Sequence, residues 1–309
     1  MSPSAVPALA PVRRGPFRLA IAIVVVATIV ILKGAMTTST GSGLAYPDYP
    51  LSDGQLMPAS AYTTVAGFLE HFHRLWAGTA GVLALWLALW LQFGGGMEGA
   101  PRRTAWFGGC LLLAQGLFGG IGVLLKLPPE TSVVHATLAQ LTLATFACLA
   151  YRLSERWRDT PRAADVPTGA GRGIAVAAVV IVVVQTVVGA LARHTNSPHA
   201  LWTHVGNALV VFLAATIATA FALGRLGDTP GVKGLARTIV TLLIVQIALG
   251  FVVLAIRNPA GKTPENVRDL GTAFTISVHV LLGALLTVLM ATLAAHVYRA
   301  TRAPGPGPA

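Results

Sequence analysis

Residues 66–93 read AGFLEHFHRLWAGTAGVLALWLALWLQF, and this stretch decides what kind of protein the chain is. It is largely apolar, and it is longer than the roughly 20 residues that a helix needs to cross a membrane. It also carries a histidine, His73, near its start. Ionisable side chains inside membrane spans are rare and usually functional. The stretch therefore predicts a membrane helix that carries a functional group.

The rest of the chain has the same character. Of its 309 residues 54% are hydrophobic and 11% are charged, whereas about 25% are charged in a soluble domain. We predict an all-α integral membrane protein with eight transmembrane helices. The predicted spans are 17–37, 66–93, 104–126, 132–151, 173–193, 200–224, 235–256 and 271–298.

The net charge of +11 does not indicate nucleic-acid binding, because the basic residues lie in loops between spans without interleaved aromatic residues. With the N-terminus inside, the inner segments hold fifteen Lys and Arg residues and the outer segments hold six. The positive-inside rule then predicts a multi-pass protein of the cell (inner) membrane with both termini cytoplasmic. The first span lacks a clear small-residue cleavage site, so we expect a retained helix rather than a signal peptide.

The two cysteines, Cys110 and Cys148, lie within predicted spans and belong to no CxxC motif. This pattern argues against a thiolate metal site and against a disulfide. We expect both to be small buried packing residues.

A repeat divides the chain into two halves. Gln115–Gly119, Gln185–Gly189 and Gln246–Gly250 share the pattern Q-x-x-x-G, and each precedes a histidine; Gly34 holds the comparable place before His73. We predict a unit formed by a helix that ends in a glycine-containing turn, an outer loop and a second helix that starts near a histidine. Four such units give two pseudo-symmetric four-helix bundles. The expected divisions are a disordered N-terminus (1–16), an N-terminal half (17–152), a basic linker (153–172), a C-terminal half (173–299) and a disordered tail (300–309).

The four histidines of the repeat are candidate metal ligands: His73, His135, His204 and His279. Neutral imidazole binds haem iron through one ring nitrogen, and a bis-histidine site needs one imidazole from each of two facing helices. We expect one haem iron between His73 and His135 and another between His204 and His279. All four should lie in the outer halves of their helices, and the glycines near them (Gly78, Gly81, Gly206 and Gly283) would leave clearance for a flat ligand. The other four histidines are expected elsewhere: His71 at the headgroups or loop, His194 and His199 solvated in a short loop, and His296 at the inner interface.

Two further residues stand near His73. Glu70 lies three positions earlier on the same helical face, where it could accept a proton beside a haem edge or simply favour the helix N-terminus. Arg74 could contact a haem propionate or extend to the lipid headgroups.

The segment Glu70-His-Phe-His-Arg74, together with Thr40-Gly-Ser-Gly-Leu-Ala-Tyr-Pro-Asp-Tyr-Pro50 and Gly54-Gln-Leu-Met-Pro58, resembles the haem A synthase family, the cytochrome oxidase assembly proteins also called CtaA/Cox15. The resemblance extends over residues 17–300. It implies an enzyme that oxidises the C8 methyl group of haem O to a formyl group by successive hydroxylations. His73 and His135 would hold the substrate haem, and Glu70 would be the catalytic carboxylate. His204 and His279 would hold a haem b that relays electrons, with quinone as a possible partner and a haem O synthase as a possible source of haem O.

The chain also departs from the family's pattern. Many bacterial members carry a cysteine pair in the first outer loop, where this chain has Tyr46 and Ser52. Two other classes of protein stay open at this point. A non-catalytic di-haem cytochrome b linked to quinone explains the histidines but gives Glu70 no task, and a repeat-built transporter would place its polar groups nearer the midplane. Small-residue helix faces permit a homo-oligomer without specifying one.

Overall fold

The computed structural model describes residues 14–94, 99–161, 168–256 and 269–301. Within these ranges the regular structure is helical. Eight long helices have the length and composition to cross a membrane, and two short helices lie in connections. The long helices are α1 (Arg14–Ser39), α3 (Val65–Phe93), α4 (Ala100–Leu124), α5 (Pro129–Leu153), α7 (Thr168–His194), α8 (Pro198–Leu226), α9 (Val232–Ile256) and α10 (Leu270–Ala300); the short ones are α2 (Ser60–Thr63) and α6 (Glu155–Asp159).

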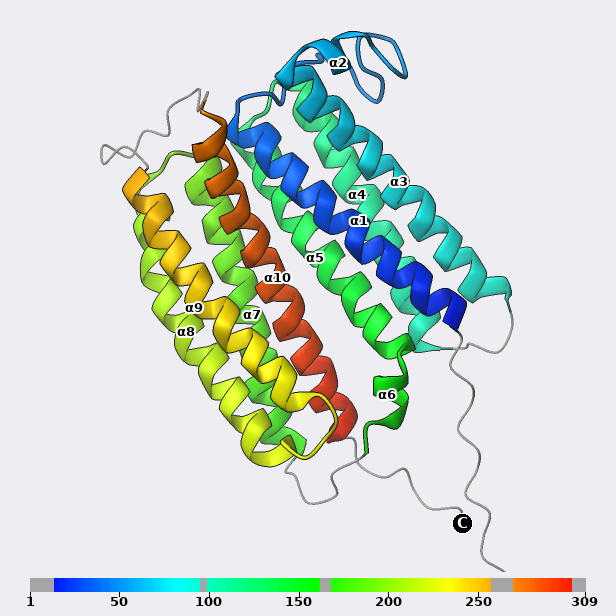
Figure 1. Cartoon of the computed structure of the whole chain (residues 1–309), viewed down its shortest axis with the longest axis vertical. Coiled ribbons are helices and arrows are strands. Elements are labelled where there is room, and N and C mark those ends of the chain that lie inside the picture. The colour runs from blue at the N-terminus through cyan, green and yellow to red at the C-terminus, as the bar shows by residue number, and fades with distance from the viewer. Residues whose placement is uncertain (1–13, 95–98, 162–167, 257–268, 302–309) are drawn as a thin grey trace, which may run out of the picture.

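The eight long helices form two groups of four that lie side by side (Figure 1). In the first group, α3 and α5 each pack against both α1 and α4, so they stand diagonally across the group. In the second group, α8 and α10 stand in the same relation to α7 and α9. The groups meet where α1 and α5 pack against α10 and where α5 packs against α7. All eight predicted spans are confirmed, with ends that differ by a few residues.

The starts of several helices are set by short polar side chains that accept the first free backbone N–H groups. Thr64 accepts from Gly67 at the start of α3, and Ser197 does the same at the start of α8. Asp269 accepts from two backbone N–H groups at the start of α10. These caps fix where α3, α8 and α10 begin, and hence how far into these helices His73, His204 and His279 lie.

Apolar side chains fill the interior of each group and also cover its outside. One buried cluster lies within each group, and a smaller one that includes Ala27, Leu143 and Ala284 joins them. Large apolar side chains such as Val82, Trp86 and Leu113 are exposed on the helix surfaces, as expected where lipid tails replace water.

The structure corrects two expectations about local features. Gly34, Gly119, Gly189 and Gly250 lie inside their helices, one to two turns before the helix ends, and not in turns. Cys110 is exposed and Cys148 is partly exposed, so neither is a fully buried packing residue; both are free thiols. Residues 1–13 of the predicted N-terminus, 162–167 of the linker and 302–309 of the tail lie outside the described residues, whereas residues 14–16 belong to α1.

A polar cluster joins the two groups at the end opposite the repeat histidines. His296 is buried on α10, although we expected it at the interface. Its Nδ1 lies 2.6 Å from the Tyr151 hydroxyl and its Nε2 lies 2.9 Å from the Thr229 hydroxyl. The Thr229 hydroxyl already donates to the carbonyl of Leu226, so it accepts from Nε2–H, and Nδ1 accepts from Tyr151. Each polar atom of the imidazole is thereby satisfied.

Candidate functional site

The histidines of the first half face each other across the interior of their group. His73 on α3 and His135 on α5 have ring centroids 6.4 Å apart, with their planes at 79°. The Nδ1 of His73 lies 3.1 Å from the Val30 carbonyl, and the Nδ1 of His135 lies 2.8 Å from the Gln115 carbonyl. A carbonyl can only accept, so both Nδ1 atoms carry the proton and both Nε2 atoms keep a lone pair. That tautomer is the one a metal ligand needs.

Each of these hydrogen bonds depends on a glycine one helical turn further along the chain. Gly34 follows Val30 by four residues, and Gly119 follows Gln115 by four. A Cβ at Gly34 would lie 2.7 Å from Cε1 of His73, and one at Gly119 would lie 2.9 Å from Cε1 of His135. Only a residue without a side chain leaves room for the imidazole to reach that carbonyl. The glycines of the repeat are therefore seats for the histidine rings.

The second half repeats this arrangement with different polar contacts. His204 on α8 and His279 on α10 have ring centroids 6.3 Å apart, with their planes at 82°. A Cβ at Gly189 would lie 2.8 Å from the His204 ring, and one at Gly250 would lie 3.2 Å from the His279 ring. The glutamines of the repeat face the same place.

Gln185 donates to the His204 carbonyl at 2.9 Å, and its oxygen accepts from Asn207 at 2.8 Å. The side-chain nitrogen of Gln246 lies 3.5 Å from Nε2 of His279. The repeat glutamines of the second half thus act through their side chains, whereas Gln115 uses its backbone carbonyl.

Both pairs lie at the same end of the bundle. The four histidines stand seven to ten residues into helices that all begin at that end, and the four glycines stand near the ends of the helices that finish there. The four histidines therefore lie at matching positions along the bundle, and their depth in the membrane stays a prediction.

The spacing of each pair fits one iron between two imidazoles. An imidazole nitrogen binds a metal at about 2 Å, and about 1 Å separates that nitrogen from the ring centre, so two rings on opposite sides of a metal have centres about 6 Å apart. The flanking glycines leave space, because a Cβ at Gly78 or at Gly206 would meet nothing within 4 Å. Among the described residues no group of three or more His, Cys, Asp or Glu side chains could hold a metal ion. Two facing imidazoles at this spacing fit a macrocycle that supplies its own equatorial ligands.

Glu70 and Arg74 form an ion pair one turn apart on α3. Nη2 of Arg74 lies 2.5 Å from Oε1 of Glu70, and Oε2 of Glu70 accepts from the backbone N–H of Tyr46 at 3.1 Å. The carboxylate is almost fully buried. The two carboxylate oxygens can together accept about four hydrogen bonds, so the arrangement orients Glu70 without using all its capacity to accept.

The rest of the Arg74 guanidinium holds the first loop, residues 40–59 between α1 and α2. It donates to the carbonyl oxygens of Asp48 (2.7 Å), Tyr46 (3.1 Å) and Leu51. A propionate contact for Arg74 stays a prediction, because its donors are directed to the loop and to Glu70 in this structure. Sequence reasoning missed this role, since the partners are backbone carbonyls that leave no pattern in the sequence.

The same loop is fastened by side-chain hydrogen bonds at Tyr46 and Ser52. The Tyr46 hydroxyl lies 3.0 Å from the Ser60 hydroxyl, and the Ser52 hydroxyl lies 3.0 Å from Nδ1 of His71. His71 therefore faces the loop, and it is buried there. Tyr49 donates to the carbonyl of Gly116 on α4 at 3.2 Å. The loop thus covers the end of the first histidine pair.

Asp48 organises the turn within this loop. Its carboxylate accepts from the backbone N–H of Gly54 at 2.8 Å and of Asp53 at 2.9 Å. The hydrogen bond from Gly54, aided by that from Asp53, lowers the pKa of Asp48 below its usual value.

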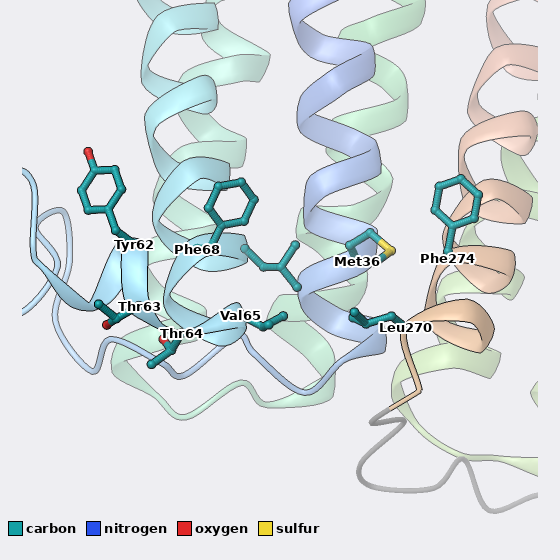
Figure 2. Close-up of a pocket in the computed structure, with 9 residues that line it drawn as sticks. Met36, Tyr62, Thr63, Thr64, Val65, Phe68, Leu270 and Phe274 are labelled. Carbon is teal, nitrogen blue, oxygen red and sulfur yellow. The ribbon is translucent and has the colours of Figure 1, made fainter.

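An apolar groove of about 570 Å³ opens at this end of the molecule between α3 and α10, with α1 behind it (Figure 2). Phe68 and Phe274 stand on its two sides, each five residues before a histidine of the repeat. The residues of α3 and α10 that line the groove precede His73 and His279 in the sequence, and none of the four histidines lines it. Of the remaining histidines, His199 is exposed as expected, whereas His194 ends α7 and is partly buried.

A family model for cytochrome oxidase assembly proteins (COX15-CtaA) matches residues 17–207. The chain belongs to this family. The matched region includes both histidines of the first pair and His204, whereas His279 lies beyond it. The family and the eight apolar helices together make the chain a multi-pass membrane protein.

Curated relatives carry the name "Heme A synthase". The protein of Geobacillus kaustophilus is 28% identical over 173 residues, which cover 54% of this chain and 53% of the relative. That of Bacillus licheniformis is 29% identical over 173 residues, 54% of this chain and 55% of the relative. That of Shouchella clausii is 26% identical over 170 residues, 55% of this chain and 56% of the relative. The chain thus matches about half the length of these relatives.

Proposed function

We propose that the chain is a haem A synthase that oxidises the C8 methyl group of haem O to a formyl group. The observation that carries the proposal is the first histidine pair, 6.4 Å apart with both Nδ1 atoms held by carbonyls and with a buried carboxylate three residues before His73. The relatives named Heme A synthase support the same activity.

In this proposal His73 and His135 hold the iron of haem O, the substrate. Two successive hydroxylations convert its methyl group to a gem-diol. Each one takes up the oxygen of one water and releases two protons and two electrons, and the electrons pass to quinone, the acceptor named in this proposal. The gem-diol then loses water to leave the formyl group. The hydrogen bonds to Val30 and Gln115 keep the imidazoles in the ligand tautomer. The loop over the pair excludes water from the site.

Glu70 is proposed as the catalytic carboxylate. It lies on the same face of α3 as His73, and Arg74 holds it in one orientation. The corresponding positions before His204 and His279 are Leu201 and Ile276, so only the first half has a carboxylate there. A buried carboxylate beside a reacting carbon can accept a proton or hold a water or hydroxyl.

His204 and His279 are proposed to hold a haem b, which accepts and passes on single electrons when bound. Their spacing of 6.3 Å equals that of the first pair within 0.1 Å, so both pairs suit the same kind of ligand. The proposed orientation places both pairs toward the outer face, with both termini in the cytoplasm and quinone as a possible acceptor of electrons.

The decisive experiment is co-expression with a haem O synthase in a host that makes no haem A. Haem A in the extracted haems supports the enzyme, and haem B and haem O alone would refute it. Because the two pairs are so alike, the second candidate function is a non-catalytic di-haem cytochrome. It predicts that the extract contains haem B and haem O without haem A and that the protein shows a bis-histidine spectrum.

The role of Glu70 needs a variant that separates chemistry from loop binding. Glu70→Gln keeps the shape of the side chain and one accepting oxygen, which can face Arg74 or the Tyr46 N–H but not both, and it removes the charge. We expect it to abolish haem A while haem binding persists; retained synthesis would show that Glu70 serves only to hold the loop. His204→Ala and His279→Ala should each remove the b-type spectrum, and an unaltered spectrum would contradict the second pair.

A further inference from the structure

A directed chain of hydrogen bonds crosses the contact between the two groups of helices. Nη2 of Arg193, near the end of α7, donates to the Ala35 carbonyl at 2.9 Å and to the Ser39 hydroxyl at 2.8 Å, both on α1. The Ser39 hydroxyl lies 3.3 Å from that of Ser277 on α10, and Ser277 donates to the Ala273 carbonyl at 2.7 Å. Because the Ser277 proton is used there, Ser39 donates to Ser277. The hydrogen bonds therefore all run in one direction: α7 donates to α1, and α1 donates to α10.

This series of hydrogen bonds lies beside both histidine pairs. Arg193 follows Gly189 by four residues on one face of α7, and Gly189 is the seat of the His204 ring. Its acceptor Ala35 follows Gly34, the seat of the His73 ring.

At the other end of this series of hydrogen bonds, Ser277 stands two residues before His279. One cation thus stands next to elements of both sites.

The surroundings keep the charge in place. A guanidinium stays protonated at any physiological pH, and its acceptors lie near the C-terminal end of α1, where the helix dipole is negative. The Ser39 and Ser277 side chains are buried, so little water screens the charge.

We propose that Arg193 is a positioning residue that fixes one positive charge between the two sites and raises the midpoint reduction potential of the haem held by His204 and His279. The inference rests on the proposed function, because it requires haem at that pair. Reduction adds an electron to the iron centre, and a nearby positive charge stabilises the reduced form relative to the oxidised form.

The chain offers a matched control on the same helix. Arg172, near the other end of α7, donates to the hydroxyl and the carbonyl of Thr301 at 3.3 Å and 3.1 Å. Its contacts resemble those of Arg193, but it is 21 residues earlier, about 30 Å along the helix. Arg172→Gln therefore removes an equal charge and similar contacts far from the histidines.

The test is a spectroelectrochemical titration of the full-length protein, purified in detergent with the haem it retains. We expect Arg193→Gln to lower the midpoint potential of the b-type haem and Arg172→Gln to leave it within error of the wild type. A potential unchanged by Arg193→Gln, or an equal shift from Arg172→Gln, would overturn the inference.

A second pair of variants covers the case in which Arg193→Gln does not fold. Ser39→Asp places a carboxylate beside the guanidinium, which cancels its charge but keeps a contact, and should also lower the potential; Ser39→Asn is its neutral control and should not. Equal potentials for these two variants would likewise refute the role of the charge. If the wild type holds no haem at His204 and His279, the proposed function of this pair fails as well; haem bound with unresponsive potentials defeats this inference alone.

Discussion

The glycine seats of the histidines allow a sharp test, for which Gly119→Ala is the clearest variant. Its Cβ would lie 2.9 Å from Cε1 and 3.1 Å from Nδ1 of His135, whereas ordinary contact begins near 3.4 Å. The ring must therefore move by about 0.5 Å, since atoms this close repel steeply. It cannot do so freely, because Nδ1 is held 2.8 Å from the Gln115 carbonyl.

The expected magnitude follows from three contributions. Overpacking costs about 1–3 kcal/mol, and weakening the buried hydrogen bond costs about 1 kcal/mol. Replacing a helical glycine by alanine returns about 0.5–1 kcal/mol. The net loss of about 1–3 kcal/mol at the ligand position corresponds to haem affinity lower by roughly 5- to 150-fold.

The assay is haem titration of purified protein, followed by the bis-histidine absorbance and by haem content per chain. Gly109→Ala on the same helix is the matched control, because a Cβ there meets nothing within 4 Å. This variant should bind haem normally and unfold at a slightly higher temperature. If Gly119→Ala binds haem as tightly as Gly109→Ala, the glycine is not a seat for the ring and the reasoning fails.

Three further outcomes are expected. Tyr151→Phe leaves Nδ1 of buried His296 without its donor and should destabilise the protein by about 1–3 kcal/mol, seen as earlier thermal unfolding in detergent with unchanged haem content; an unchanged melting curve would contradict the cluster. Arg74→Lys cannot reach several carbonyls at once, so the loop 40–59 should become protease-sensitive while the His pair still binds haem; a loop that stays resistant would count against this. The pKa of Asp48 is lowered mainly by the hydrogen bond from the Gly54 N–H. Its stabilisation of the loop is therefore fully present above the unfolded pKa near 4 and is lost as the pH falls through the lower folded pKa. Protease resistance of the loop should decline only in strong acid, and Asp48→Asn should remove this pH dependence.

The membrane class and the spans could be read from the sequence because they depend on local composition. A run of about 20 apolar residues is stable across a bilayer as a helix whatever surrounds it. The caps Thr64, Ser197 and Asp269 are likewise local signals. For the same reason the repeat of glycine and histidine was visible, since each copy lies within two consecutive helices.

The functions of Arg74, Arg193 and His296 could not be read in this way. Arg74 and Arg193 act on backbone carbonyls, which every residue possesses, and His296 pairs with Tyr151, 145 residues away. Such contacts arise only when helices distant in the sequence pack together.

The eight membrane helices and the matching places of the four histidines follow from the order of the residues alone, because hydrophobic length and the repeat are properties of single segments. The tertiary structure decided that α3 and α5, and likewise α8 and α10, stand diagonally so that their imidazoles face each other about 6.4 Å and 6.3 Å apart. It also decided that the glycines seat the rings, that Arg74 holds Glu70 under the first loop, and that Arg193 links the two halves. These depend on the packing of side chains against helices from elsewhere in the chain, which no periodicity within one segment records.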